Sequence, residues 1–287
     1  QPLRRRLGNR DAPHPKDAWL FYQALIGAWP DTLTPDDGPG LAELCERMQQ
    51  YLEKALREAK ERTRWTDVKA DYEAAVMDFV AAALDPGRSA QFLSDVRSII
   101  DLTGAASTAN ALAQLLFKLT APGVPDIYQG TEEWDFSLVD PDNRRPVDYQ
   151  ARASALDESE GCSLDLRHST AKLQVIHSVL SLRRDDPKLF GHGDYRALEV
   201  QGPARQSVVA FARTYEGRAL LVCALRYGRA TPEALEASEL ALDDQLARLG
   251  WTDVFHPRRL PPHPALPLTT ALGSRPIALL YARPSDA

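Results

Sequence analysis

Cysteine is scarce in this chain of 287 residues, and the few cysteines are scattered. Cys45, Cys162 and Cys223 lie far apart, whereas a disulfide framework or a zinc site would require clustered cysteines. The six histidines show no metal-ligand spacing either. We therefore expect reduced thiols, a cytoplasmic location and no bound metal.

Long apolar runs and an excess of basic residues are also missing. No stretch approaches the ~20 apolar residues of a membrane helix, and no signal peptide opens the chain. The net charge of −6 argues against a nucleic-acid partner, because phosphates are bound by basic surfaces. No glycine-rich nucleotide motif and no G-x-S-x-G nucleophile elbow occurs, so we expect no cofactor.

The first 120 residues show the apolar spacing of amphipathic helices. We predict a helix that Asp17 caps and that runs to about Ala28, and further helices near 41–62 and 72–83. Two separate helices are expected after these, at about 90–100 and from about 108.

The pattern changes after Gly123. Residues 124–128 are predicted to form a short strand, and a polar loop rich in Asp, Asn and Arg follows. Further helices are expected after Pro146 and at about 169–184. From Asp194 onwards, strand-like runs alternate with glycine-containing turns, which is typical of an antiparallel β domain.

The segment 120–149 carries a specific motif. It contains the pattern G-x-P-x-I-Y-x-G-x-E and continues FSLVDPDNRRPVDY. This segment resembles the last strand and following loop of an α-amylase-type barrel (glycoside hydrolase family 13), and the longer form is similar to its trehalose-forming branch. Residues 13–65 resemble the maltooligosyltrehalose synthase family more than the trehalohydrolases, although Arg64 stands where the family usually has serine.

The resemblance implies an α/β fold followed by an all-β domain. Residues 1–186 would be the C-terminal part of a TIM-type (β/α)8 barrel, with a helical insertion at about 39–104. Residues 187–287 would form a C-terminal β-sandwich domain. In barrels of this kind the active site lies at the carboxyl ends of the strands.

The activity that the resemblance implies is an intramolecular transglycosylation. The terminal α-1,4 linkage at the reducing end of a maltooligosaccharide becomes an α,α-1,1 linkage, as in trehalose biosynthesis. Such chemistry uses two carboxyl groups, and in the family these precede the first segment that matches here. We therefore assign no catalytic residue.

The start of the chain favours the same interpretation. It opens QPLRRRLGNR without an initiator methionine, so we expect a fragment. Because the resemblance places the catalytic carboxyl groups outside it, we expect this fragment to be inactive alone. Its partners would be a maltooligosaccharide substrate and the N-terminal remainder of the same enzyme.

Nine residues on the polar segment are candidates for substrate binding, because carboxylates, amides and guanidinium groups hydrogen-bond sugar hydroxyls. Two structural interpretations compete: the loop is held by its own salt bridges and only shapes the rim, and Glu132 pairs with an arginine. The candidates are Tyr128, Gln129, Glu132, Asp140, Asp142, Asn143, Arg144, Arg145 and Asp148.

Two other functions remain open at this stage. The chain could be a non-catalytic carbohydrate-binding or scaffolding module of the same ancestry. It could also belong to a maltooligosyltrehalose trehalohydrolase, which uses the same loop motif with an attack by water.

Overall fold

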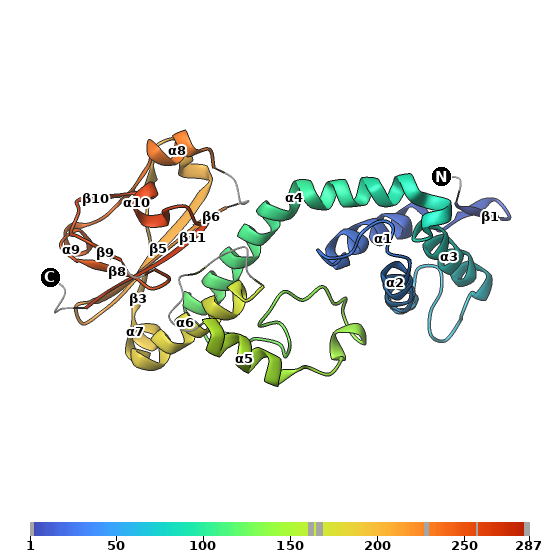
Figure 1. Ribbon diagram of the computed structural model, residues 1–287, viewed down its shortest axis with the longest axis horizontal. Coiled ribbons are helices and arrows are strands. Elements are labelled where there is room, and N and C mark those ends of the chain that lie inside the picture. The colour runs from blue at the N-terminus through green and yellow to red at the C-terminus, as the bar shows by residue number, and fades with distance from the viewer. Residues whose placement is uncertain (1–2, 160–163, 165–168, 227–229, 257, 284–287) are drawn as a thin grey trace. The chain divides into compact units, whose positions relative to one another are not determined.

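The computed structural model describes residues 3–159, 164, 169–226, 230–256 and 258–283. The chain divides into two compact units. The first comprises Gln1–Thr103 and Asp135–Pro146, and the second comprises Gly104–Trp134 and Val147–Ala287. Figure 1 shows the elements of each unit.

The first unit is helical apart from one hairpin. Its apolar core joins Phe21 and Leu25 of α1, Met48 and Leu52 of α2, and residues of α3 such as Phe79. Its elements are β1 Arg5–Leu7, β2 Arg10–Ala12, α1 Pro15–Ala28, α2 Gly38–Ala59, α3 Ala70–Ala83, the first part of α4 Pro86–Thr120, and the short helix η1 Asp142–Arg144.

The start of α1 differs from the sequence prediction. His14, not Asp17, is the N-cap, and its ring Nδ1 accepts a hydrogen bond from the Lys16 amide at 3.2 Å. Pro15 follows in the first helical position, which suits its fixed φ. Asp17 lies in the first turn and is buried.

The prediction of two separate helices near 90–100 and after 108 was wrong. One helix, α4, runs from Pro86 to Thr120, and its one non-helical residue is Ser89. The stretch between the two predicted helices contains Gly104, but a single glycine costs a helix only about 1 kcal/mol. Thr103 also turns its hydroxyl back onto the carbonyl oxygen of Ile99 at 2.8 Å, a bond that destabilises a helix only slightly.

The second unit is built around an antiparallel sheet of six strands in the order β3-β5-β6-β11-β8-β9, accompanied by a three-stranded sheet in the order β10-β7-β4. The strands are β3 Asp194–Ala197, β4 Val200–Gln201, β5 Val208–Tyr215, β6 Arg218–Leu225, β7 Glu239–Ala241, β8 Trp251–Asp253, β9 Arg259–Leu260, β10 Ala265–Pro267 and β11 Ile277–Ala282. The helices are the end of α4, α5 Tyr149–Ser159, α6 Ala171–Asp185, α7 Pro187–His192, η2 Pro203–Gln206, α8 Pro232–Glu236, α9 Asp244–Ala247 and α10 Leu268–Leu272.

Both faces of the large sheet are covered. Phe211, Val222 and Leu279 pack against the end of α4 and against α6 and α7. The alternate residues on the same strands, such as Cys223 and Leu280, pack against the small sheet and α10. Side chains alternate between the two faces of a strand, which explains why β11 is buried at every position. The predicted combination of helices with antiparallel sheets is thus confirmed.

Two further expectations concern the middle of the chain. Residues 124–128 form no strand, which corrects the sequence prediction. A strand requires a neighbour for its N–H and C=O groups, and no strand in the described part of the chain pairs with this segment. The predicted domain ranges 1–186 and 187–287 remain predictions, and they divide the chain elsewhere than the two compact units do.

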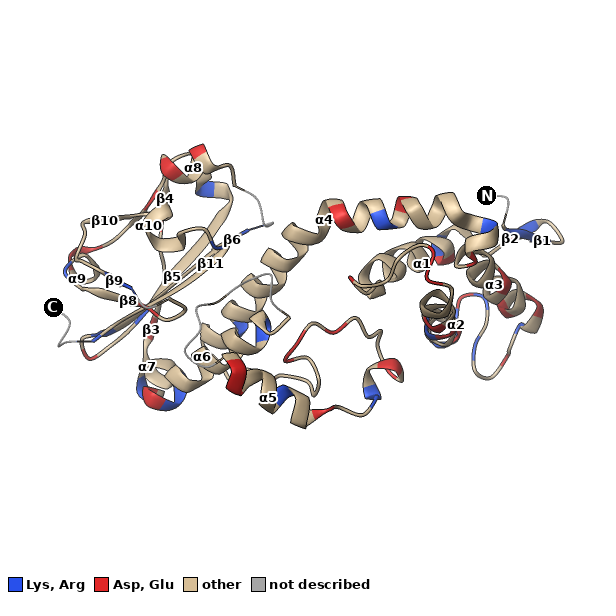
Figure 2. Cartoon of the chain, viewed as in Figure 1, with Lys and Arg blue, Asp and Glu red and all other residues tan. Residues whose placement is uncertain are grey.

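Three findings concern membrane helices, metal sites and the distribution of charge. None of the described helices is long and apolar enough to cross a membrane. Among the described residues, no group of His, Cys, Asp and Glu side chains could hold a metal ion. Figure 2 shows acidic and basic residues interspersed in both units.

Cys45 and Cys223 are free thiols, and Cys162 lies outside the described residues. Burial raises the pKa of Cys223 to about 12. Because the thiolate is the reactive form, we expect Cys223 in a Cys162→Ser background to resist a thiol reagent at neutral pH until the chain unfolds. Counting modified thiols with and without denaturant checks this, and fast labelling of Cys223 in the folded chain would contradict it.

Candidate functional site

Arg47 and Lys54 of α2 hold the part of the polar segment that belongs to the first unit, Asp135–Pro146. These two residues lie two turns apart on one face of the helix. Arg47 binds both oxygens of Asp142: its Nε is 3.1 Å from Oδ1 and its Nη2 is 3.0 Å from Oδ2. The same Nη2 donates to the carbonyl oxygen of Phe136 at 2.6 Å. The guanidinium group therefore fixes the start and the middle of the segment at once.

Asp142 is a buried anchor of this segment. Its side chain is 9% exposed, and Oδ2 also accepts a hydrogen bond from the Leu138 amide at 2.7 Å. Burial alone would raise the pKa of this carboxyl, but the hydrogen bonds from Arg47 and the Leu138 amide outweigh it, and the pKa lies below its ordinary value. The carboxylate is thus committed to holding the loop, which favours the structural interpretation for Asp142.

Asp140 and Arg145 also make contacts within the segment. Lys54 Nζ lies 2.7 Å from Asp140 Oδ1, and this hydrogen bond is the main reason that the pKa of Asp140 is lowered. Arg145 donates to Ser137 Oγ at 2.9 Å and to the Asp142 carbonyl oxygen at 3.1 Å. Both residues help to shape the loop.

Arg144 and Asn143 keep free bonding capacity. The Arg144 side chain is 67% exposed and forms an ion pair with Asp140 at 3.0 Å. Asn143 Oδ1 is buried and has no hydrogen-bond partner. A buried polar atom without a partner is unusual, so these two residues are the strongest candidates for ligand contact in the first unit.

The other four candidates lie in the second unit, around Arg152 of α5. Arg152 Nη2 donates to the Gly130 carbonyl oxygen at 3.1 Å, and its Nε lies 3.4 Å from Glu132 Oε2. Glu132 therefore has the arginine ion-pair partner that the structural interpretation requires, although its buried Oε2 makes no hydrogen bond. Gly130 has a φ of +87°, a conformation that glycine adopts readily.

The remaining three candidates, Asp148, Tyr128 and Gln129, differ in whether the side chain is free to bind a ligand. Asp148 Oδ1 accepts from the Ala151 amide at 2.9 Å, as a helix cap does. Tyr128 is 45% exposed, and its carbonyl oxygen accepts from Thr131 in a tight turn. Gln129 is exposed. Of the four candidates in this unit, Tyr128 and Gln129 have the side chains that remain open to a ligand.

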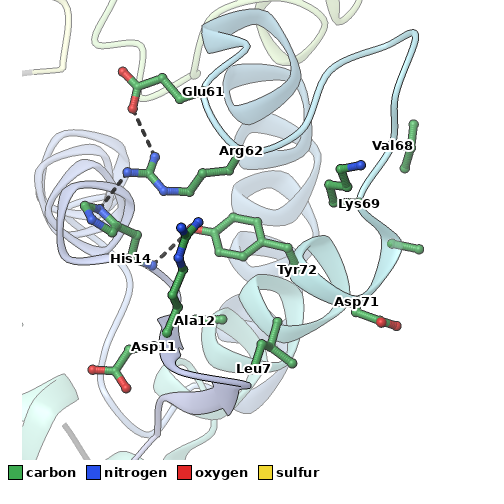
Figure 3. Close-up of a pocket in the computed structure, with 12 residues that line it drawn as sticks. Leu7, Asp11, Ala12, His14, Glu61, Arg62, Val68, Lys69, Asp71 and Tyr72 are labelled. Atoms are coloured by element: carbon green, nitrogen blue, oxygen red, sulfur yellow. Dashed lines mark hydrogen bonds and ion pairs between the residues drawn. The ribbon is translucent and has the colours of Figure 1, made fainter.

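The first unit also contains a pocket that the sequence did not predict (Figure 3). Its volume is about 920 Å³, and it lies between the β1–β2 hairpin, the Glu61–Lys69 loop and the start of α3. The sequence feature that could have predicted this hairpin is its two-residue turn, Gly8–Asn9, in which Gly8 has a φ of +61°. The lining residues are Leu7, Arg10, Asp11, Ala12, His14, Glu61, Arg62, Val68, Lys69, Ala70, Asp71 and Tyr72.

A hydrogen-bond network forms one wall of this pocket. The Tyr72 hydroxyl donates to Asp17 and accepts from the His14 amide at 3.0 Å. Arg62 lies 3.2 Å from Asp17 Oδ1 and 2.7 Å from His14 Nδ1. Burial, followed by the bond to Asp17, raises the pKa of Tyr72, so the phenol remains a neutral donor. These groups satisfy one another and join α1 to α3.

Comparison with known proteins agrees with the motif. No protein-family model matches the chain. A Mycobacterium tuberculosis protein named "Putative maltooligosyl trehalose synthase" is 35% identical over 272 residues, which is 94% of this chain and 31% of the relative. The solved structure of maltooligosyltrehalose synthase from Arthrobacter ramosus is 31% identical, with a TM-score of 0.75 over 92% of this chain and 32% of that one.

A second solved structure shows the same fold at lower identity. The "hypothetical maltooligosyl trehalose synthase" of Sulfolobus tokodaii is 23% identical, with a TM-score of 0.63 over 93% of this chain and 32% of that one. By fold and by sequence, the chain is similar to proteins named maltooligosyl trehalose synthase. The similarity covers only a part of those proteins, because the chain spans about a third of their length.

Proposed function

We propose that this chain is part of an enzyme that converts the terminal α-1,4 linkage at the reducing end of maltooligosaccharides to an α,α-1,1 linkage by intramolecular transglycosylation. The observation that supports this most strongly is the similarity to maltooligosyl trehalose synthases over 94% of the chain. The motif at residues 120–149 supports the same activity.

The same proposal covers the architecture. Residues 1–186 would supply the C-terminal part of a (β/α)8 barrel with its helical insertion, and residues 187–287 would form the β-sandwich domain. The similarity in fold to the Arthrobacter ramosus synthase over 92% of this chain supports this.

Catalysis would divide between this chain and the rest of the enzyme. The two carboxyl groups that attack the anomeric carbon and protonate the leaving oxygen would lie outside residues 1–287. This chain would contribute contacts to sugar hydroxyls, foremost from Arg144 and Asn143, and from Tyr128 and Gln129. Such contacts would keep the released glucose in place until it attacks through its own anomeric hydroxyl.

Alone, the chain should not convert maltopentaose to a non-reducing product. The experiment that tests the proposal replaces the aligned third of the Arthrobacter ramosus synthase with this chain. The chimera should remove reducing ends from maltopentaose, whereas the relative without that third should not. Conversion by the isolated chain would mean that it contains its own nucleophile.

The comparisons favour neither alternative. A scaffolding module would bind maltooligosaccharides but leave the chimera inactive. A trehalohydrolase would release free trehalose from maltooligosyl trehalose and would leave the reducing ends of maltopentaose intact. Chromatography of the products that the chimera forms from maltopentaose and from maltooligosyl trehalose therefore separates all three functions.

A further inference from the structure

Arg213 carries a charge into the apolar core of the second unit. It lies on β5, on the face that packs against the helices, and is only 2% exposed. Its guanidinium group has no acidic partner among the described residues. Instead it donates to two backbone oxygens, those of Gly193 at 2.9 Å and Thr120 at 3.4 Å. A buried charge is costly unless it is compensated, so these carbonyl groups have to supply the compensation.

Arg183 of α6 approaches the same end of α4. Its Nη1 donates to the Leu119 carbonyl oxygen at 2.8 Å, and its Nη2 donates to that of Gly123 at 3.0 Å. The guanidinium group also lies 4.9 Å from the centre of the Phe190 ring. One planar group thus bridges the last turn of α4 and the turn that follows it.

The end of a helix explains why two arginines are tolerated here although neither has a carboxylate partner among the residues that the structure describes. The last carbonyl groups of a helix have no partner within it, and they carry the negative end of the helix dipole. Leu119 and Thr120 are the last two residues of α4. Burial lowers the pKa of both guanidinium groups, and the charge of Arg183 lowers that of Arg213 further, but an arginine keeps its proton in proteins.

The position of this helix end matters for the segment that follows. From Gly123 the chain runs without regular structure to Tyr128, Gln129 and Glu132. We propose that Arg183 and Arg213 are positioning residues, which fix the end of α4 and the Gly123 turn and thereby determine where the Tyr128–Glu132 segment lies. The link to catalysis rests on the proposed function, whereas the structural effect does not.

The first test is independent of activity. Arg183→Met removes the bridge and Arg183→Lys keeps the charge but cannot span both oxygens in the same way. In both variants of this chain, we expect the Lys118–Ala121 amides to exchange hydrogen about tenfold faster, and chymotrypsin to cut after Tyr128 faster. The amides of β5 and β6 should be unchanged. Arg184→Met is the matched control, because the neighbouring Arg184 is 74% exposed.

Two results would overturn the proposal: unchanged exchange and cleavage in both Arg183 variants, or equal acceleration throughout the sheet, which would show a general loss of stability. Arg213 is buried, so its replacement changes the core as well as the helix end. The Arg183 variants therefore decide whether the positioning proposal holds. In the active chimera, Arg183→Lys should lower kcat about tenfold at an unchanged melting temperature. An unaltered kcat there contradicts the link to catalysis. A chimera that is inactive before any substitution contradicts the proposed function instead, and the exchange experiment still decides the positioning role.

Discussion

Replacing Arg47 with methionine should lower the free energy of unfolding by about 3 kcal/mol. Removing one member of a buried ion pair leaves the other charge desolvated and unpaired, and the Arg47 and Asp142 side chains are only 13% and 9% exposed. The variant would also lose the bond to the Phe136 carbonyl oxygen. Urea unfolding of the variant beside the parent chain measures the effect.

Two further variants show that the pair itself is responsible. Arg145→Met is the control: that side chain is 52% exposed, so its loss should cost at most about 1 kcal/mol. The double variant Arg47→Met with Asp142→Asn should recover part of the loss, because no unpaired charge remains. A cost for Arg47→Met no larger than that for Arg145→Met would contradict the anchoring role.

The contribution of Asp142 should depend on pH in a defined direction. Its pKa in the folded chain is lower than normal, so the folded state favours the ionised form. This stability is fully present above the unfolded pKa of about 3.9 and is lost as the pH falls through the folded value. The difference between the parent chain and Asp142→Asn should therefore be large near pH 7 and disappear in strong acid.

Arg144→Ala in the active chimera should slow transglycosylation by one to two orders of magnitude. A hydrogen bond to a charged group contributes about 1.5–3 kcal/mol, which corresponds to roughly a 10- to 100-fold change in rate. Hydrolysis should suffer less, because an attack by water does not require the glucose to be retained. The product ratio should therefore shift toward free glucose, and chromatography measures both products.

Arg145→Ala separates sugar contact from loop structure. Arg145 lies one residue further on but is bonded to Ser137 and to the Asp142 carbonyl oxygen. Its loss should lower the melting temperature and leave the product ratio nearly unchanged. If Arg144→Ala behaves in the same way, the Asp140–Arg145 segment serves only as a scaffold and the assignment of Arg144 is wrong.

Local patterns predicted most of the helices and strands. The apolar stripe of α2 and the strand runs after Asp194 are features of short windows of sequence. The errors arose where the local structure depends on a partner distant in the sequence, or where the sequence feature used for the prediction has only a small effect. The residues 124–128 form a strand only if a neighbouring strand is present, and the periodicity of a segment cannot report its neighbours.

For the candidate site, too, local composition was informative and long-range contacts were not. The polar composition of the Asp140–Asp148 loop identified it as important, but not what each side chain does. Asp142 looked like a sugar ligand because its partner Arg47 lies 95 positions away. Asp148 looked equivalent, yet it caps α5. Only the folded chain distinguishes these occupied carboxylates from the exposed side chain of Arg144 and the Asn143 oxygen that has no hydrogen-bond partner.

The most direct test of the account is the linkage in the product that the chimera forms from maltopentaose. Proton NMR of that product should show an α,α-1,1-linked terminal pair of glucose units and no reducing-end anomeric signals. The relative lacking the replaced third should leave maltopentaose unchanged. If a chimera that folds and binds maltopentaose forms no α,α-1,1 linkage, the proposal that this chain is part of a trehalose-forming enzyme is wrong.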